Sequence, residues 1–199
     1  MRPRVLNIRG VQSRSAHANC PRASGRSLAA RGGGANGARM KLLLALALPI
    51  FALDQATKWW ILGKSGGVIG WQEPVIPNFF DLCYLANTGA AFSSFHNNNG
   101  AFIVIALVAL VGLVIATARG VFPDRLSKIG VGLLVGGILG NVTDRLIHGH
   151  VVDFLLFDLH VRFADPWPAF NVADSAICSA VGLFILASFL APKTTAQAA

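Results

Sequence analysis

The sequence predicts an all-α membrane protein with four transmembrane helices and a small extracytoplasmic β-cradle between the first and second helices. Two observations on composition support this class: 54% of the 199 residues are apolar and only 13% are charged, and the mean hydropathy is +0.57. Soluble domains usually carry about 25% charged residues. The third observation is that the apolar residues gather in four runs, each close to the length that crosses a bilayer.

The first 39 residues carry all of the excess positive charge. They contain eight arginines and no acidic residue, whereas the chain from Met40 onward has nine Lys or Arg and nine Asp or Glu. The net charge of +8 therefore does not predict that the protein binds nucleic acid. This leader has the composition of a transit peptide or a disordered segment, and the preferred interpretation is a true start at Met40. We expect residues 40–192 to form the membrane domain and residues 193–199 to form a tail.

The first predicted span, residues 40–62, is interrupted by two charges. Asp54 and Lys58 stand four residues apart, which places opposite charges on one face of a helix with the acid nearer its N-terminus. The two opposite charges can neutralise each other inside the membrane. The interruption is therefore compatible with a span.

The segment that follows the first span, residues 63–99, is rich in aromatic residues and turn formers. Its stretch FFDLCYLANTG is typical of a strand followed by a turn, since Asn87 and Gly89 tolerate a positive φ. We expect a small sheet on the membrane surface, with its aromatic side chains at the depth of the lipid headgroups.

The second predicted span, residues 100–118, is the most regular. It contains no charged residue and, at about 1.5 Å per residue, reaches roughly 28 Å, close to the hydrocarbon thickness. The third run, between Lys128 and Asp144, is short. Its glycines suit close helix packing, and an inward Asn141 together with a snorkelling Lys128 makes it a span. The fourth span is expected at residues 175–192.

Basic residues predict how the spans are oriented. They flank the first span, the connection between the second and third spans, and the end of the fourth: Lys41, Arg119, Arg125, Lys128 and Lys193. Because such residues concentrate on the cytoplasmic side, both termini are expected there. Residues 63–99 and 146–171 are then extracytoplasmic.

The acidic residues of the second outer segment predict hydrolytic chemistry. Asp153 follows the third span and Asp174 begins the fourth, so one outer loop brings both to the same membrane face. Two carboxylates within hydrogen-bond distance share a proton, which allows one to activate water while the other protonates a scissile carbonyl. This pattern indicates an aspartic protease, although spacing alone leaves Asp158 and Asp165 open as alternatives. Asp174 also suits a structural role, as the third residue of a helix capped by Asn171.

Other polar residues have ordinary structural interpretations as well. Asp144 and Arg145 are either a charge pair that ends the third span or a site where the guanidinium binds a substrate carbonyl or lipid ester. His148 and His150 fit no common zinc motif. The three cysteines show no CxxC spacing, so neither a metal site nor a disulfide is predicted.

Five motifs in series, DQATK, NTGAAF, GNVTDR, GHVVDF and FNVADS, resemble those of the lipoprotein signal peptidases (signal peptidase II). The resemblance covers roughly residues 40–190. It implies that the catalytic pair is Asp153 and Asp174. The residues that it implies for binding or positioning the substrate are Asn87, Gly89, Asn141, Arg145 and Asn171. It also implies a buried supporting network of Asp54, Lys58 and Asp144.

The resemblance also implies the substrate and the cellular setting. The substrate is a bacterial prolipoprotein whose cysteine carries diacylglycerol, cleaved on the amino side of that cysteine. The enzyme lies in the bacterial inner membrane, surrounded by membrane lipids, as a monomer with its active site at the extracytoplasmic face and no metal or organic cofactor. Two rival interpretations are a proton-coupled transporter, which places its acids at mid-bilayer, and a membrane scaffold whose acids are helix caps.

Overall fold

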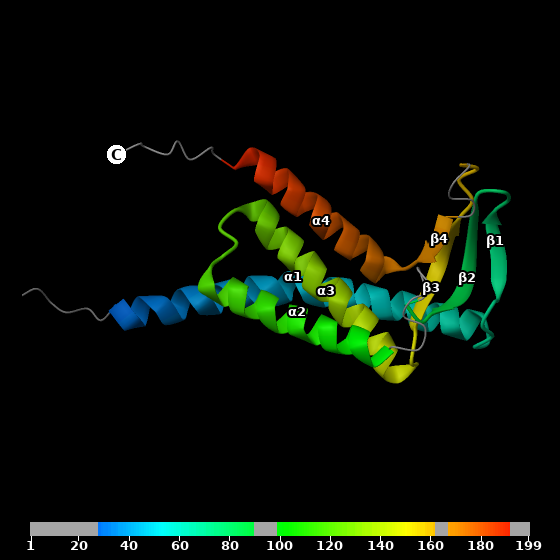
Figure 1. Cartoon of the computed structure of the whole chain (residues 1–199), viewed down its shortest axis with the longest axis horizontal. Helices are drawn as coiled ribbons and strands as arrows, with labels where there is room; N and C mark the ends of the chain where they lie inside the picture. The colour runs from blue at the N-terminus through cyan, green and yellow to red at the C-terminus, as the bar shows by residue number, and fades with distance from the viewer. Residues whose placement is uncertain (1–27, 90–98, 162–166, 192–199) are drawn as a thin grey trace, which may run out of the picture.

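The computed structural model describes residues 28–89, 99–161 and 167–191, with side chains from residue 34 onward. These residues form four helices, each of which contains a stretch long and apolar enough to cross a membrane. The helices are α1 (Leu28–Lys64), α2 (Asn99–Arg119), α3 (Arg125–Ile147) and α4 (Val172–Leu190). They lie together as an elongated bundle (Figure 1). The expected number of spans is confirmed.

The helix boundaries differ from expectation chiefly in α1. This helix begins at Leu28, inside the leader that we expected to lie outside the fold. Arg39 gives one reason, because its Nη1 donates to the carbonyl of Ala118 near the end of α2 at 3.1 Å. The turn of helix immediately before Met40 is therefore held by a neighbouring helix.

Helix α3 resolves the ambiguity of the short third run. Asp124 caps its N-terminus and accepts a hydrogen bond from the backbone N–H of Ser127 at 2.8 Å, which is a strong start signal. The helix then continues past Asp144 and Arg145 to Ile147. Both charges are thus inside the helix rather than beyond its end.

Glycines allow α3 to pack closely between α1 and α4. A Cβ atom added at Gly136 would lie 2.7 Å from the carbonyl oxygen of Ala47 in α1, and one added at Gly137 would lie 2.6 Å from that of Ala173 in α4. Such distances leave no room for a methyl group. Small residues let helix backbones approach each other in this way.

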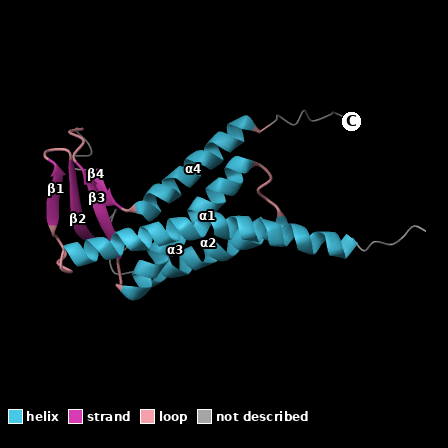
Figure 2. Cartoon of the chain, turned by 180° about the vertical axis from the view of Figure 1, so that it is seen from behind, coloured by secondary structure: helices cyan, strands magenta, loops and turns pink. Residues whose placement is uncertain are grey.

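A four-stranded antiparallel sheet lies at one end of the bundle (Figure 2). Its strands, in spatial order, are β1 (Gln72–Ile76), β2 (Phe80–Asn87), β3 (Val151–Phe157) and β4 (Trp167–Phe170). The strand expected in FFDLCYLANTG is β2. However, only half of the sheet comes from the connection between α1 and α2. The other half comes from the connection between α3 and α4, since β2 pairs with β3.

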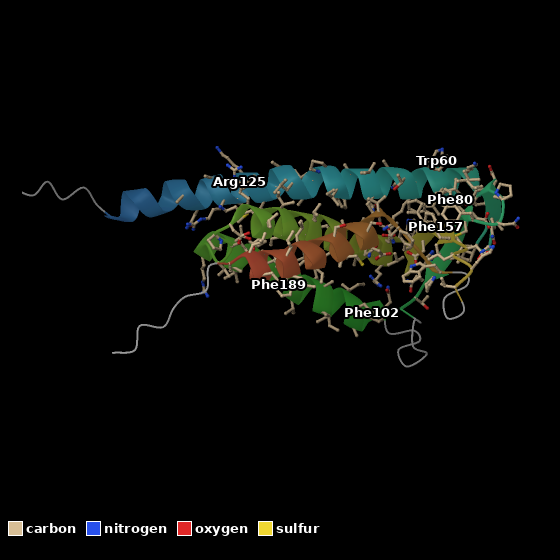
Figure 3. The ribbon with its side chains drawn as sticks, turned by 90° about the horizontal axis from the view of Figure 1, so that it is seen from above. Trp60, Phe80, Phe102, Arg125, Phe157 and Phe189 are labelled. Atoms are coloured by element: carbon tan, nitrogen blue, oxygen red, sulfur yellow. The ribbon has the colours of Figure 1, made fainter. Side chains whose placement is uncertain are left out.

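Aromatic stacking holds the strands of the sheet together, and a buried cluster fixes the sheet to the bundle. On one part of the sheet, the ring of Phe157 stacks on Phe80 and Phe170, with centroids 4.7 and 5.8 Å away; Phe80 and Phe157 are seen at the sheet end of the molecule in Figure 3. Nearer the helices, a buried cluster joins the end of α1 to β2 and β3: Ile61, Tyr84, Val152 and Phe154. The strand that carries Asp153 is therefore held rigidly above the helices.

Candidate active site

Asp153 lies on β3, where the sheet meets the bundle. The residue is only 3% exposed. Its Oδ2 accepts a hydrogen bond from Asn87 Nδ2 at 2.9 Å, and its Oδ1 accepts one from Asn171 Nδ2 at 2.8 Å. Burial, reinforced by the negative charge of Asp174, raises the pKa of Asp153 to about 7 despite these two donors. The side chain can therefore hold a proton near neutral pH.

Asp174 lies in the first turn of α4 as part of a capping box. Asn171 Oδ1 accepts from the backbone N–H of Asp174 at 2.9 Å, and the backbone N–H of Asn171 donates to Asp174 Oδ2 at 3.2 Å. The expected cap is thus confirmed. Asp174 Oδ1 also accepts from Asn141 Nδ2 at 2.8 Å. The carboxylate stands at the positive end of a helix dipole, a position that favours a negative charge, and it remains partly exposed.

Two buried asparagines connect these acids. Asn171 uses its amide oxygen for the cap, so its NH₂ group faces Asp153. Asn141 accepts from Lys58 Nζ through its oxygen at 3.0 Å, so its NH₂ group faces Asp174. Within the described part of the chain, no hydrogen bond joins the two carboxylates directly. That the two carboxyl groups share one hydrogen therefore stays a prediction.

Gly89 fixes the orientation of the third amide, that of Asn87. Gly89 has φ +90°, and its N–H donates to Asn87 Oδ1 at 2.8 Å, which confirms the expected turn. The NH₂ group of Asn87 must then face Asp153. A Cβ atom at Gly89 would also collide with the ring of Phe102, so glycine is required here for space as well as for φ.

A buried ion-pair network supports both acids. Lys58 Nζ lies 2.8 Å from Asp54 Oδ2, as the four-residue spacing predicts, and 2.8 Å from Asp144 Oδ2. Asp144 thus joins Asp54 and Lys58, as the family resemblance implies, and no ion pair with Arg145, the alternative that spacing left open, is present among the described residues. Gln55, a residue that sequence reasoning missed despite its place in DQATK, donates to Asp144 Oδ1 at 3.0 Å and Asp54 Oδ2 at 3.2 Å.

The network holds the backbone directly before each acid. Asp144 Oδ2 accepts from the N–H of Val152 at 3.0 Å, and Asp54 Oδ1 accepts from the N–H of Ala173 at 2.9 Å. Val152 precedes Asp153, and Ala173 precedes Asp174. One buried lysine therefore connects, through two carboxylates, to the positions of both candidate catalytic groups.

Arg145 lies at the end of an apolar groove. Its guanidinium lies 5.1 Å from the centre of the Phe102 ring, and its Nη1 lies 3.5 Å from the carbonyl of Asn141. Its buried Nε has no hydrogen-bond partner within the described residues. The groove, of about 260 Å³, runs between α2, α3 and α4 and is lined by Phe102, Ile105, Ala106, Ala109, Ile138, Asn141, Val142, Arg145 and Ile177. An extended apolar ligand in this groove would meet polar groups only at Asn141 and Arg145.

The remaining candidates lie elsewhere. Asp158 follows the far end of β3 and contacts His160 at 2.8 Å on the surface, whereas Asp165 lies outside the described residues. His150 contacts the Tyr84 hydroxyl at 3.0 Å, and burial lowers the pKa of this histidine. Across residues 28–89, 99–161 and 167–191, no cluster of three possible metal ligands is present.

Comparisons with known proteins show what this chain is similar to. A family model described as "Signal peptidase (SPase) II" matches residues 46–190. The lipoprotein signal peptidase of Neisseria meningitidis (serogroup C, serotype 2a) is 45% identical over 153 residues, which cover 75% of this chain and 89% of that protein. The lipoprotein signal peptidase of Syntrophotalea carbinolica is 43% identical over 158 residues, covering 76% and 93%.

Solved structures share the fold. One, described as a bacterial membrane enzyme, superposes with a TM-score of 0.67 at 27% identity and covers 79% of this chain and 93% of its own. A second superposes with a TM-score of 0.65 at 30% identity, covering 77% and 94%. The match to the family extends through both candidate acids and all four helices. The chain therefore belongs to the signal peptidase II family, a family of membrane proteases that process lipoproteins.

Proposed function

We propose that this chain is an aspartic endopeptidase that removes the signal peptide from diacylglyceryl-modified prolipoproteins, cleaving on the amino side of the lipidated cysteine. The observation that carries the proposal is the pair formed by Asp153 and Asp174. Asn171 contacts both side chains, yet the two carboxyl groups have different surroundings. Acid and base catalysis by two like groups needs this difference.

The surroundings assign the two roles. Asp174 accepts from Asn141 and from the N–H of Asn171 at the N-terminus of α4, and its side chain stays partly exposed, where water can approach it. Asp153 is buried and holds its proton up to about pH 7. Asp174 is therefore the general base, and Asp153 is the general acid.

The reaction follows from these roles. Asp174 takes a proton from a water molecule, whose oxygen attacks the scissile carbonyl carbon while Asp153 gives its proton to the carbonyl oxygen. The tetrahedral intermediate then collapses. Asp174 returns its proton to the leaving amide nitrogen, and Asp153 recovers one from a hydroxyl group of the intermediate. The apolar groove between α2, α3 and α4 suits the signal peptide, and the unpaired Nε of Arg145 suits a substrate carbonyl.

Substitution of either acid tests the assignment. Asp153→Asn and Asp174→Asn each remove a proton-transfer group, so we expect cleavage of purified diacylglyceryl-prolipoprotein to fall by about 10³-fold or more. The matched control is Asp81→Asn on β2, where the carboxylate contacts Gln72 at the surface of the sheet. Control activity should equal that of the wild type. An Asp153 or Asp174 variant with undiminished turnover would refute the mechanism.

The dependence of rate on pH tests the division of roles. Because Asp153 must be protonated, kcat/KM should fall as the pH rises through about 7, and because Asp174 must be ionised, it should also fall in acid. The profile is therefore a bell whose two limbs belong to the coupled pair. Constant activity from pH 6 to about 9 would show that Asp153 does not supply a proton.

We also propose that the end of the molecule with the sheet faces outward from the cytoplasm. Arg119 and Arg125 lie at the opposite end of the bundle, where basic residues favour the cytoplasmic side; Arg125 is seen there in Figure 3. A cysteine placed at Arg119 should be protected from an impermeant thiol reagent in intact cells, whereas one placed at Glu73 of β1 should react. The reverse pattern would contradict this orientation.

A further inference from the structure

A second hollow lies between α1 and α2, at the opposite end of the bundle from the two acids. Its walls come from α1, from the end of α2, from the connection to α3 and from α3 itself: Arg39, Leu42, Leu43, Thr117, Phe122, Lys128 and Val131. The interior, about 20 Å³, holds no more than a water molecule. A larger ligand must therefore lie across its mouth.

Two cations with unused donors border this hollow. Arg39 Nη1 donates to Ala118 O and to Asn36 Oδ1, and its Nε and Nη2 have no acceptor among the residues that the structure describes. Lys128 Nζ donates to the carbonyl of Pro123 at 2.8 Å. This bond uses one of its three N–H protons, and the other two can donate to a ligand. The described residues that line the hollow include no acidic side chain. The charge of this site is therefore not balanced by the residues that form it.

The position of Arg39 is built into the fold. Gly120, with φ +75°, has no Cβ, and one placed there would lie 2.8 Å from Arg39 Cζ. The guanidinium thus packs against the turn that ends α2, and a carbonyl of α2 holds it in place. Such a fixed guanidinium differs from an ordinary surface arginine, since less side-chain entropy is lost when it binds an anion.

We propose that this hollow binds an anionic phospholipid, whose phosphate bridges Arg39 and Lys128 and whose acyl chain lies along Leu42 and Phe122. The lining is mostly apolar, which favours a lipid over a free anion. Leu42 is itself 43% exposed, so an acyl chain in the membrane can reach it. Basic pockets between transmembrane helices recognise anionic headgroups in this way. The lipid belongs to the leaflet opposite the candidate active site.

Lipid-dependent stability of the whole chain tests the site. Purified protein in an uncharged detergent is titrated with phosphatidylglycerol or with phosphatidylcholine of the same acyl chains, and the rise in Tm is followed. Two cations at about fivefold each predict a preference for phosphatidylglycerol on the order of 25-fold. Lys128→Gln should lower this preference about fivefold. Arg39→Gln should do the same, whereas Arg39→Lys should keep part of it.

The controls separate this site from general electrostatics. Arg119→Gln and Arg125→Gln change exposed cations at the same end that do not line the hollow, so both should retain the full preference. An equal loss in these controls, or no preference in the wild type, would overturn the proposal. So would an equal Tm rise with inorganic phosphate alone. Because the readout is the shift caused by lipid, a lower starting Tm in a variant does not obscure it.

The proposal is independent of the peptidase chemistry. Asp153→Asn should bind phosphatidylglycerol as the wild type does, since Asp153 lies at the other end of the bundle. Lys128→Gln should keep the turnover number of the wild type in detergent without added lipid. A failure of lipid binding and a failure of the catalytic assignment are therefore separately visible.

Discussion

The side chain of Asn171 performs two functions that exclude any other orientation of its amide. Its oxygen caps α4 through the N–H of Asp174, and its NH₂ group donates to Asp153 at 2.8 Å. A reversed amide would place a donor against the helix N-terminus and an acceptor against a carboxyl oxygen. The fold of α4 therefore fixes a hydrogen bond of the candidate active site.

Substitutions at Asn171 can separate these two functions. Serine is a good N-cap but is too short to donate to Asp153, so Asn171→Ser should keep most of the stability of α4 and still lower kcat/KM by about 10-fold or more. Loss of a donor to the ionised form should also raise the pKa of Asp153, which moves the alkaline limb to higher pH.

Asn171→Ala is the matched comparison, since it loses the cap as well. It should unfold at a lower temperature than Asn171→Ser, by the equivalent of about 1 kcal/mol. Equal Tm values for the two variants, or an unchanged alkaline limb in the serine variant, would show that the two functions are not separable in this way.

At the scale of elements, helix α3 organises the bundle because its glycines face two neighbours at once. Gly136 approaches α1 and Gly137 approaches α4, and this closeness brings Asn141 of α3 within reach of both Lys58 and Asp174. Larger residues on this face would separate the helices. The hydrogen bonds of Asn141 to Lys58 and Asp174 would then be lost, even though none of these three residues has changed.

Gly137→Ala tests this dependence. The added methyl group meets the backbone of Ala173 in α4, so we expect a loss of about 1–3 kcal/mol in the free energy of unfolding, with a reduced cleavage rate. Gly112→Ala in α2, where nothing lies within 4 Å of the added atom, should change stability by less than about 1 kcal/mol. Thermal unfolding of both variants decides the matter, and similar losses in the two would count against a packing role.

At the scale of the whole molecule, the ion-pair network joins three helices to the sheet. Lys58 of α1 contacts Asp144 of α3. Asp144 Oδ2 also accepts from the backbone of β3, while Asp54 reaches the start of α4. Removing a single buried partner leaves an uncompensated charge, which costs far more than the pair contributes.

Lys58→Met should therefore destabilise the protein by about 3–5 kcal/mol, measured by unfolding in detergent. Part of this loss should return when Asp144→Asn is added, since one unpaired carboxylate is then removed. If Lys58→Met alone unfolded at the temperature of the wild type, the network would have no structural role.

The sequence was sufficient to predict the features that depend on neighbouring residues. The four spans, the strand in FFDLCYLANTG, the turn at Gly89 and the pair of Asp54 with Lys58 all follow from spacing. The pairing of β2 with β3 does not, because it joins segments separated by two spans. For the same reason spacing offered Arg145 as one partner of Asp144, and only the family resemblance implied the network with Asp54 and Lys58, because Lys58 stands in another helix. The helix before Met40 was missed because its stabilising contact, Ala118, is equally distant in sequence.

Because β2 pairs with β3, the candidate active site is completed only late in the synthesis of the chain. Asn87 arrives early in synthesis, but Asp153, to which it donates, and the capped turn that begins α4 are among the later segments. A chain halted before Asp174 possesses most of the membrane domain and yet lacks the candidate base. Such a truncated product can insert, but it cannot cut.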